Sequence, residues 1–228
     1  MQNHIEIERT FEKKTAFRYV LDLPENYEKS SERFPLILFL HGMGQRGESF
    51  DDMKVYGMPK VAAERDIPAV VVSPVCPETT TWIEELDALH SLIIHAVREY
   101  RVDPECIYLT GLSMGGFGTW HLAEKYPYLF AAAAPICGGA LHEFGFLDRI
   151  HRIAHLPVWT FHGAKDDVVP IERTQILVDR LRQEGGNVEF TVYPEADHDS
   201  WTETYDDPRL MDWLFRHRNT EVDLYRKG

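Results

Sequence analysis

The sequence lacks a long apolar run, a surplus of basic residues and a pattern of paired cysteines. No stretch is apolar over the roughly 20 residues that a helix needs to cross a bilayer. The chain has 24 Lys and Arg against 37 Asp and Glu, a formal net charge of −13 at pH 7. Nucleic-acid binding requires clustered Lys and Arg that neutralise phosphates. We therefore expect neither a nucleic-acid partner nor a membrane partner.

The three cysteines indicate neither a disulfide framework nor a zinc site. Cys76, Cys106 and Cys137 are an odd number and lie far apart. Each falls in or beside an apolar run, where a free cysteine packs as a small hydrophobe. No C-x-x-C motif is present, and the adjacent residues 197–199, Asp-His-Asp, point in diverging directions. We expect reduced buried thiols, no metal ion and no cofactor.

The N-terminus and the length bear on location and domain number. The start, MQNHIEIERTFEKK, carries charges where a signal peptide has its apolar core, so we expect no export signal and a cytoplasmic protein. The chain shows no repeat, low-complexity tract or linker. Its 228 residues suffice for one sizeable core, so we expect a single domain over residues 1–228.

Short apolar runs indicate strands that are buried on both faces of a parallel sheet. They cover Pro35–Leu40, Ile67–Val72, Cys106–Thr110, Ala131–Ile136, Pro157–Phe161 and Val188–Tyr193. Ahead of them, His4–Phe11 and Thr15–Leu23 alternate like two paired strands joined by a turn at residues 12–14.

Helical spacing of apolar residues fills the intervals between these runs. The expected helices cover about Leu86–Tyr100, Met114–Lys125, Ile171–Gln183 and Pro208–His217, with a short one near Phe144–His151. Strands that alternate with helices predict an α/β fold with a mostly parallel, doubly wound sheet, whose sites lie at the carboxyl ends of the strands. The connection between Cys137 and Leu156 is too short for a large cap domain.

One predicted strand ends in GLSMGG, residues 111–116. Gly111, Ser113 and Gly115 match the Gly-x-Ser-x-Gly spacing of a nucleophile elbow, a sharp strand-to-helix turn that exposes a hydroxyl. A serine hydroxyl is a poor nucleophile until an oriented base removes its proton. Two later strands end at loops that offer His198 as the base and either Asp166 or Asp167 as the acid.

Four segments in the same order resemble a known family. LILFLHGMGQRG, GLSMGGFGTW, FHGAKDDVVP and EADHDSW are similar to those of single-domain α/β-hydrolases of the phospholipase/carboxylesterase and feruloyl esterase-like group, related to prolyl oligopeptidase catalytic domains. The resemblance implies Ser113 as the nucleophile, His198 as the base and, three residues after the His-Gly pair, Asp166 as the acid. The neighbouring aspartate stands where the family commonly has proline, so it remains the alternative. The resemblance also implies an oxyanion hole formed by the backbone N–H groups of Met43 and Met114.

Aromatic residues commonly line ligand pockets, so we expect Trp82 and Trp201 to contact the substrate, whereas Phe117 is expected to pack its helix. The function expected is a serine carboxylesterase that acts through an acyl-enzyme on short-chain or aryl esters, with feruloyl or acetyl esters of carbohydrate among the candidates. The alternatives are a serine peptidase of the prolyl oligopeptidase type, a lysophospholipase or thioesterase, and a non-catalytic binding protein of the same fold. The expected partner is a small-molecule or carbohydrate-linked ester, and the oligomeric state stays open.

Overall fold

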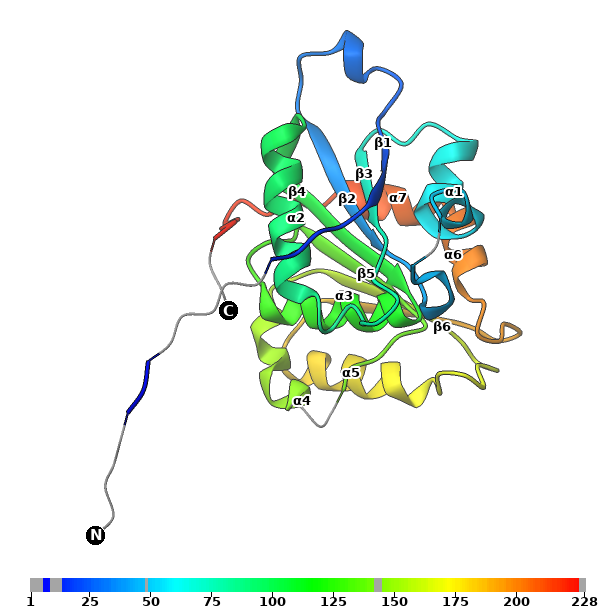
Figure 1. Cartoon of the computed structure of the whole chain (residues 1–228). Coiled ribbons are helices and arrows are strands. Elements are labelled where there is room, and N and C mark those ends of the chain that lie inside the picture. The colour runs from blue at the N-terminus through cyan, green and yellow to red at the C-terminus, as the bar shows by residue number, and fades with distance from the viewer. Residues whose placement is uncertain (1–5, 9–13, 48, 142–144, 226–228) are drawn as a thin grey trace.

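Seven strands form one sheet in the computed structural model, which describes residues 6–8, 14–47, 49–141 and 145–225 (Figure 1). Their order across the sheet is β1-β3-β2-β4-β5-β6-β7. The edge strand β1 runs antiparallel to β3, and the other pairs are parallel. The strands are β1 (Tyr19–Asp22), β2 (Phe34–Leu40), β3 (Val70–Pro74), β4 (Val102–Leu112), β5 (Ala132–Ile136), β6 (Val158–Gly163) and β7 (Val188–Tyr193). The expected mostly parallel sheet is confirmed.

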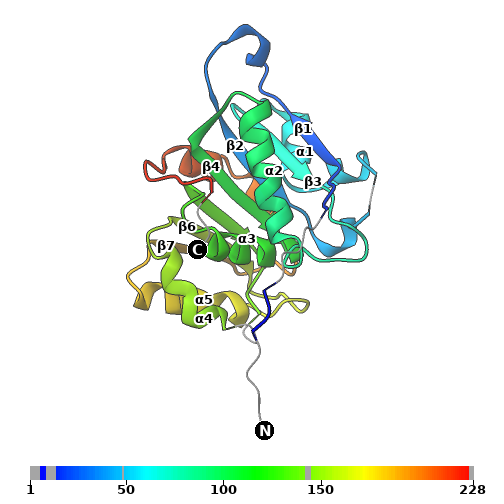
Figure 2. The same cartoon turned by 60° about the vertical axis from the view of Figure 1, so that its left-hand side comes forward.

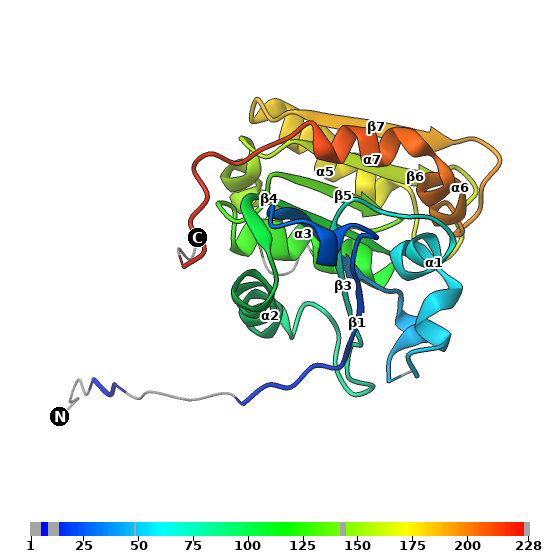
Figure 3. The ribbon, with the colours of Figure 1, turned by 90° about the horizontal axis from the view of Figure 1, so that it is seen from above.

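Helices cover both faces of this sheet (Figures 2 and 3). One face carries α2 (Leu86–Glu99), α3 (Met114–Lys125), α4 (Phe146–Arg149) and α5 (Glu172–Gln183). The other carries α1 (Gly57–Glu64), α6 (Trp201–Asp206) and α7 (Pro208–Phe215). None of these helices in the described part of the chain is long and apolar enough to span a membrane.

The two helix layers explain why the strands read as continuous apolar runs. Along β2, Leu36 and Leu38 pack into the layer of α2 and α3, whereas Ile37 and Phe39 pack into the layer of α1 and α7. Successive side chains of a strand point to opposite faces, so both faces need apolar residues.

Four elements, namely β4, α1, α6 and α4, differ from the sequence expectations. The strand expected at Cys106–Thr110 begins earlier, and β4 passes through Pro104 because its register with β2 shifts between Phe34 and Leu36. The helices α1 and α6 were not expected. The short helix α4 starts at Phe146, and the expected start at Phe144 lies outside the described residues.

The N-terminal hairpin is not seen as expected. The strand β1 is shorter than Thr15–Leu23 and pairs with β3. Its expected partner, His4–Phe11, lies mostly outside the described residues, and Glu6–Glu8 has no regular structure. The pattern of alternation could not reveal that β1 adds to the main sheet, because the partner is distant in sequence.

His121 on α3 is buried and ties the helix to the segment that follows β5. Its Nε2 accepts a hydrogen bond from the Leu141 N–H at 3.1 Å, which requires a ring nitrogen without a proton. Burial lowers the pKa of His121 to about 4, against a smaller opposing effect of the Glu124 carboxylate. The histidine is therefore neutral in the folded protein over most of the acidic range.

The free energy of unfolding should fall as the pH drops from 6.5 towards 4, because the unfolded His121 binds a proton that the native side chain does not. His121→Gln keeps an acceptor for the Leu141 N–H and cannot titrate. The variant should therefore lose about 3 kcal/mol less stability than the wild type between pH 7 and pH 4. Urea unfolding across this range measures the difference. His151→Gln, at an exposed histidine, is the control and should keep the wild-type slope; an unchanged slope in His121→Gln would contradict the assignment.

Candidate active site

Ser113 lies at the turn between β4 and α3, in a backbone conformation that non-glycine residues rarely adopt. Its φ is 54° and its ψ is −117°. The turn is possible because two backbones approach closely: a Cβ on Gly115 would lie 1.8 Å from the carbonyl oxygen of Leu40, and one on Gly111 would lie 2.5 Å from the carbonyl oxygen of Gly115. Glycine is therefore required at both positions by space, in addition to the freedom that it gives a sharp turn.

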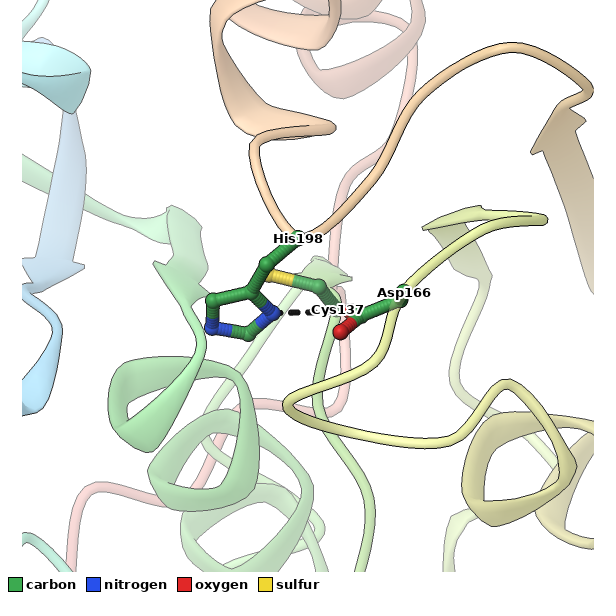
Figure 4. A group of neighbouring side chains, drawn as sticks. All are labelled: Cys137, Asp166 and His198. Carbon is green, nitrogen blue, oxygen red and sulfur yellow. Dashed lines mark hydrogen bonds and ion pairs between the residues drawn. The ribbon is translucent and has the colours of Figure 1, made fainter.

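The structure brings Ser113, His198 and Asp166 together at the carboxyl ends of three strands. Nε2 of His198 lies 2.9 Å from Oγ of Ser113. On the other side of the imidazole, Nδ1 lies 2.8 Å from Oδ2 of Asp166 (Figure 4). His198 comes from the loop after β7 and Asp166 from the loop after β6. A hydroxyl, an imidazole and a carboxylate in this order can move a proton off the hydroxyl.

The Asp166 carboxylate is fully buried and surrounded by donors. Oδ1 accepts hydrogen bonds from the N–H groups of Val168 at 3.0 Å and Val169 at 2.8 Å. Nε2 of the buried His162 lies 3.1 Å from Oδ2 and 2.8 Å from the Val169 carbonyl oxygen. Asp167 is exposed. Of the two aspartates that the sequence left open, the structure places Asp166 against His198.

The loop after β2 is held by a neutral histidine. Nδ1 of His41 donates to the Gly42 carbonyl at 2.6 Å, and its Nε2 accepts from the Cys76 N–H at 2.9 Å. Burial lowers the pKa of His41 to about 4, so this arrangement persists at neutral pH. Met43, which follows Gly42, opens a short 3-10 helix, and Met114 opens α3.

Met43 and Met114 both line a cavity that reaches Ser113. The first N–H groups of a helix have no acceptor within the helix, and they carry the positive end of its dipole. The two residues expected to form an oxyanion hole therefore lie where backbone donors are available beside the hydroxyl.

Of the two tryptophans expected at the site, one lines a cavity and the other is buried in the core. Trp201 lines a second cavity together with Ser113 and His198, and its ring stands at 88° to the His198 ring with centroids 5.3 Å apart. Trp82 is fully buried: its Nε1 donates to the His41 carbonyl at 2.9 Å, and its ring packs against the His41 ring. The expectation that Trp82 contacts the substrate is wrong, because this side chain is buried in the core and packs against the loop after β2.

Two further aromatic residues border the serine. Phe117 lies one turn into α3 and lines the cavity that contains Met114. Tyr56 precedes α1 and lines the cavity that contains Trp201. The sequence suggested only a packing role for Phe117 and no role for Tyr56. A motif at a strand end could not have located Tyr56, because this residue directly precedes α1, which packs on the face of the sheet opposite to α3.

Within the described residues, one group of possible metal ligands lies at the site. Sγ of Cys137 and ligand atoms of Asp166 and His198 are within 4.8 Å of one another (Figure 4). A metal needs a thiolate, and burial raises the pKa of Cys137 to about 12. The other two side chains already share a hydrogen bond. The group therefore fits a packed thiol beneath the imidazole better than a metal centre.

The fold and this site define an α/β-hydrolase. Residues 66–207 match the family model of the Phospholipase/Carboxylesterase family, so the chain belongs to that family. The resemblance seen in the four sequence segments is thereby confirmed.

Three similar proteins are described as esterases. The chain is 27% identical over 165 residues to a bifunctional acetylxylan esterase/xylanase of Neocallimastix patriciarum, covering 71% of this chain and 23% of that protein. It is 29% identical over 178 residues to a probable feruloyl esterase C of Aspergillus terreus, covering 74% of this chain and 62% of that protein. The crystal structure of a thermostable esterase matches with a TM-score of 0.75 at 34% identity, covering 88% of this chain and 59% of that one. The chain spans less than two thirds of each of these proteins.

Gly115→Ala should destabilise the protein by about 3 kcal/mol or more, because the new Cβ would meet the Leu40 carbonyl at 1.8 Å and backbone cannot move aside cheaply. This loss outweighs the usual preference of helices for alanine. At Gly44 nothing lies within 4 Å of an added Cβ, so Gly44→Ala is the control and should stay within about 1 kcal/mol of the wild type. Denaturant unfolding measures both, and equal stabilities would contradict the close packing at the turn.

Proposed function

We propose that this protein is a serine carboxylesterase that hydrolyses short-chain or aryl carboxylic esters through an acyl-enzyme on Ser113. The observation that carries the proposal is the pair of hydrogen bonds that link Ser113 to His198 at 2.9 Å and His198 to Asp166 at 2.8 Å. Membership in the Phospholipase/Carboxylesterase family supports it.

The first half of the reaction forms the acyl-enzyme. Nε2 of His198 takes the proton from Oγ of Ser113 as Oγ attacks the ester carbonyl carbon. The carbonyl electrons move to the oxygen, which becomes an alkoxide. The N–H groups of Met43 and Met114 donate hydrogen bonds to this alkoxide, and removing one such donor typically costs about 2.7–4 kcal/mol of transition-state stabilisation. When the carbonyl re-forms, the bond to the alcohol oxygen breaks, and the imidazolium returns its proton to that oxygen.

The second half releases the acid. A water molecule takes the place of the alcohol, Nε2 of His198 removes its proton, and the hydroxide attacks the acyl carbon. Collapse of this second tetrahedral intermediate breaks the bond to Oγ, which regains the proton. One ester and one water thus become one acid and one alcohol, and the enzyme is unchanged.

Asp166 orients the imidazole and stabilises the imidazolium in both halves. Oδ2 faces Nδ1 of His198 at 2.8 Å, while Oδ1 is occupied by the N–H groups of Val168 and Val169. Because those donors hold the carboxylate in place, Nδ1 keeps its hydrogen and Nε2 remains free to accept a proton from Ser113.

The surroundings of Ser113 favour small esters. Between β5 and β6, the described residues contain only the four-residue α4 and a 3-10 helix at Ile150–Ile153, which form no large cap. An open site has no buried apolar surface to expose at a lipid interface. The acetylxylan esterase/xylanase and the feruloyl esterase among the similar proteins favour acyl groups attached to carbohydrate as substrates.

The wild type should hydrolyse p-nitrophenyl acetate and react with a fluorophosphonate probe at Ser113. Asp166→Asn should lower kcat/KM by about 10³-fold or more, because the amide favours the wrong tautomer of His198. Asp167→Asn, at the exposed neighbour, is the matched control and should keep most of the activity.

Steady-state kinetics of the purified variants tests the acid, and peptide mapping of the labelled protein tests the nucleophile. Full activity in Asp166→Asn with loss in Asp167→Asn would move the acid by one residue. A wild type that neither labels nor hydrolyses esters would instead support a non-catalytic binding protein.

Among p-nitrophenyl esters, kcat/KM should be highest for short acyl chains, and emulsified triolein should be a poor substrate because the site lacks a cap to open at an interface. A series from acetate to palmitate, together with triolein above and below its solubility limit, measures this. Activity that peaks at long chains and rises at the interface would contradict the proposed preference for short-chain esters.

A further inference from the structure

The cleft at Ser113 consists of two lobes. The first, called the Phe117 lobe, has a volume of about 340 Å³ and is bordered by Thr81, Ile83, Met114, Phe117, Leu141 and Val169. The second, called the Trp201 lobe, has a volume of about 400 Å³ and is bordered by Gln45, Tyr56, Leu112, His198 and Trp201. Ser113, Met43 and Val168 line both, so the lobes meet at the hydroxyl.

We propose that the Phe117 lobe holds the acyl group of the substrate and the Trp201 lobe holds its alcohol. This assignment rests on the proposed esterase function. The assignment follows from the proton transfer that releases the alcohol. The alcohol oxygen leaves only when Nε2 of His198 protonates it, so that oxygen must lie beside His198. Of the two lobes, the Trp201 lobe is the one that His198 lines.

The positions of the other substituents on the reacting carbon then determine where the acyl chain lies. The tetrahedral carbon carries Oγ of Ser113, the alkoxide, the alcohol oxygen and the acyl chain. With the alkoxide at the N–H groups of Met43 and Met114 and the alcohol at His198, the chain must extend into the lobe that His198 does not line. That lobe begins at Met114 and Phe117.

Beyond Ser113, the two lobes are bordered by helices on opposite faces of the sheet. Phe117 belongs to α3, which packs on one face of the sheet. Tyr56 and Trp201 stand at the starts of α1 and α6, which pack against each other on the opposite face (Figure 1). A substrate that lies across the sheet edge at Ser113 therefore meets different helices with its two ends.

The walls of the lobes have different chemistry. Apart from Thr81 and Ser113, the Phe117 lobe is bordered by apolar side chains, which suit a hydrocarbon acyl group. In the Trp201 lobe, the rings of Tyr56 and Trp201 form an edge-to-face pair with centroids 6.3 Å apart, and Tyr56 is 44% exposed. Aromatic faces with a nearby amide, that of Gln45, suit an alcohol that carries a ring.

Two substrate series separate the lobes. In the first, the alcohol is always p-nitrophenol and the acyl group runs from acetate to octanoate. In the second, the acyl group is always acetate and the alcohol is ethanol, phenol or a methyl xyloside. The ratio of kcat/KM in variant and wild type is taken for each ester, so that differences in leaving-group reactivity cancel.

Phe117→Ala enlarges the Phe117 lobe. Its ratio should rise from acetate to octanoate by about 10-fold or more and vary by no more than about 2-fold across the alcohols. Tyr56→Ala should lower the ratio for ring-bearing alcohols about 5-fold relative to ethyl acetate, and its ratio should be flat across the acyl series. A loss on phenyl acetate alone identifies an aryl alcohol, and a loss on the xyloside acetate alone identifies a sugar.

The exchanged pattern, in which Phe117→Ala alters the alcohol series and Tyr56→Ala the acyl series, would reverse the assignment. Equal effects of either variant on both series would refute separate lobes. Thermal melting checks the fold, and Phe117→Leu takes the place of Phe117→Ala if the latter does not fold. If the wild type hydrolyses no ester of either series, the proposed esterase function fails and the assignment fails with it; hydrolysis without the expected split rejects the assignment alone.

Discussion

The contact between the start of α3 and the ends of its neighbouring strands is the constraint on which the rest of the site depends. At Gly115 the helix backbone meets the Leu40 carbonyl, and at Gly116 an added Cβ would lie 2.4 Å from the Ile136 carbonyl oxygen. The Ser113 N–H donates to that same Ile136 carbonyl at 3.0 Å. The helix starts directly against the sheet, and Ser113 at its start has φ at 54°. The first N–H groups of α3 therefore lie next to the serine in the chain, at the positive end of the helix dipole.

Hydrogen bonds from buried histidines hold the loops around this turn. His41 lies in the loop after β2 and accepts a hydrogen bond from the Cys76 N–H. His162 lies between the Asp166 carboxylate and the hydroxyl of Thr174 on α5. Burial lowers the pKa of both histidines. A buried polar group without a partner is costly, so each of these contacts strongly favours one position of its loop. Within the described residues, the three cysteines are free, and the loops are positioned without disulfides.

The groups proposed for catalysis and the walls of the cleft come from different parts of this fold. The groups proposed for catalysis stand at the carboxyl ends of β4, β6 and β7, where any doubly wound sheet gathers its loops. The walls of the cleft come from the surrounding helices, through Phe117 on one face and Tyr56 and Trp201 on the other. The same reacting groups can therefore serve different esters when the helix residues at the cleft change, which is why family membership alone does not name a substrate.

Several features were determined by the sequence itself. The doubly wound sheet followed from apolar runs with helical segments between them, and the helix Met114–Lys125 matched its expected bounds. The serine turn followed from the glycine spacing around Ser113, and the position of His198 at the same edge of the sheet followed from its place after the last strand. These inferences succeeded because strand burial and the glycine requirement act locally, within a few residues of the chain.

Other features were decided only by tertiary structure. Asp166 and Asp167 are chemically identical, and what separates them is that the N–H groups of Val168 and Val169 turn one carboxylate inward while the other faces water. Trp82 and Trp201 likewise read alike in the sequence, yet one is buried under the His41 carbonyl and the other faces the cleft. Both residues also make a contact with a residue far away in the chain, Asp166 with His198 and Trp82 with His41, and such contacts are set by how the helices and loops pack on the sheet.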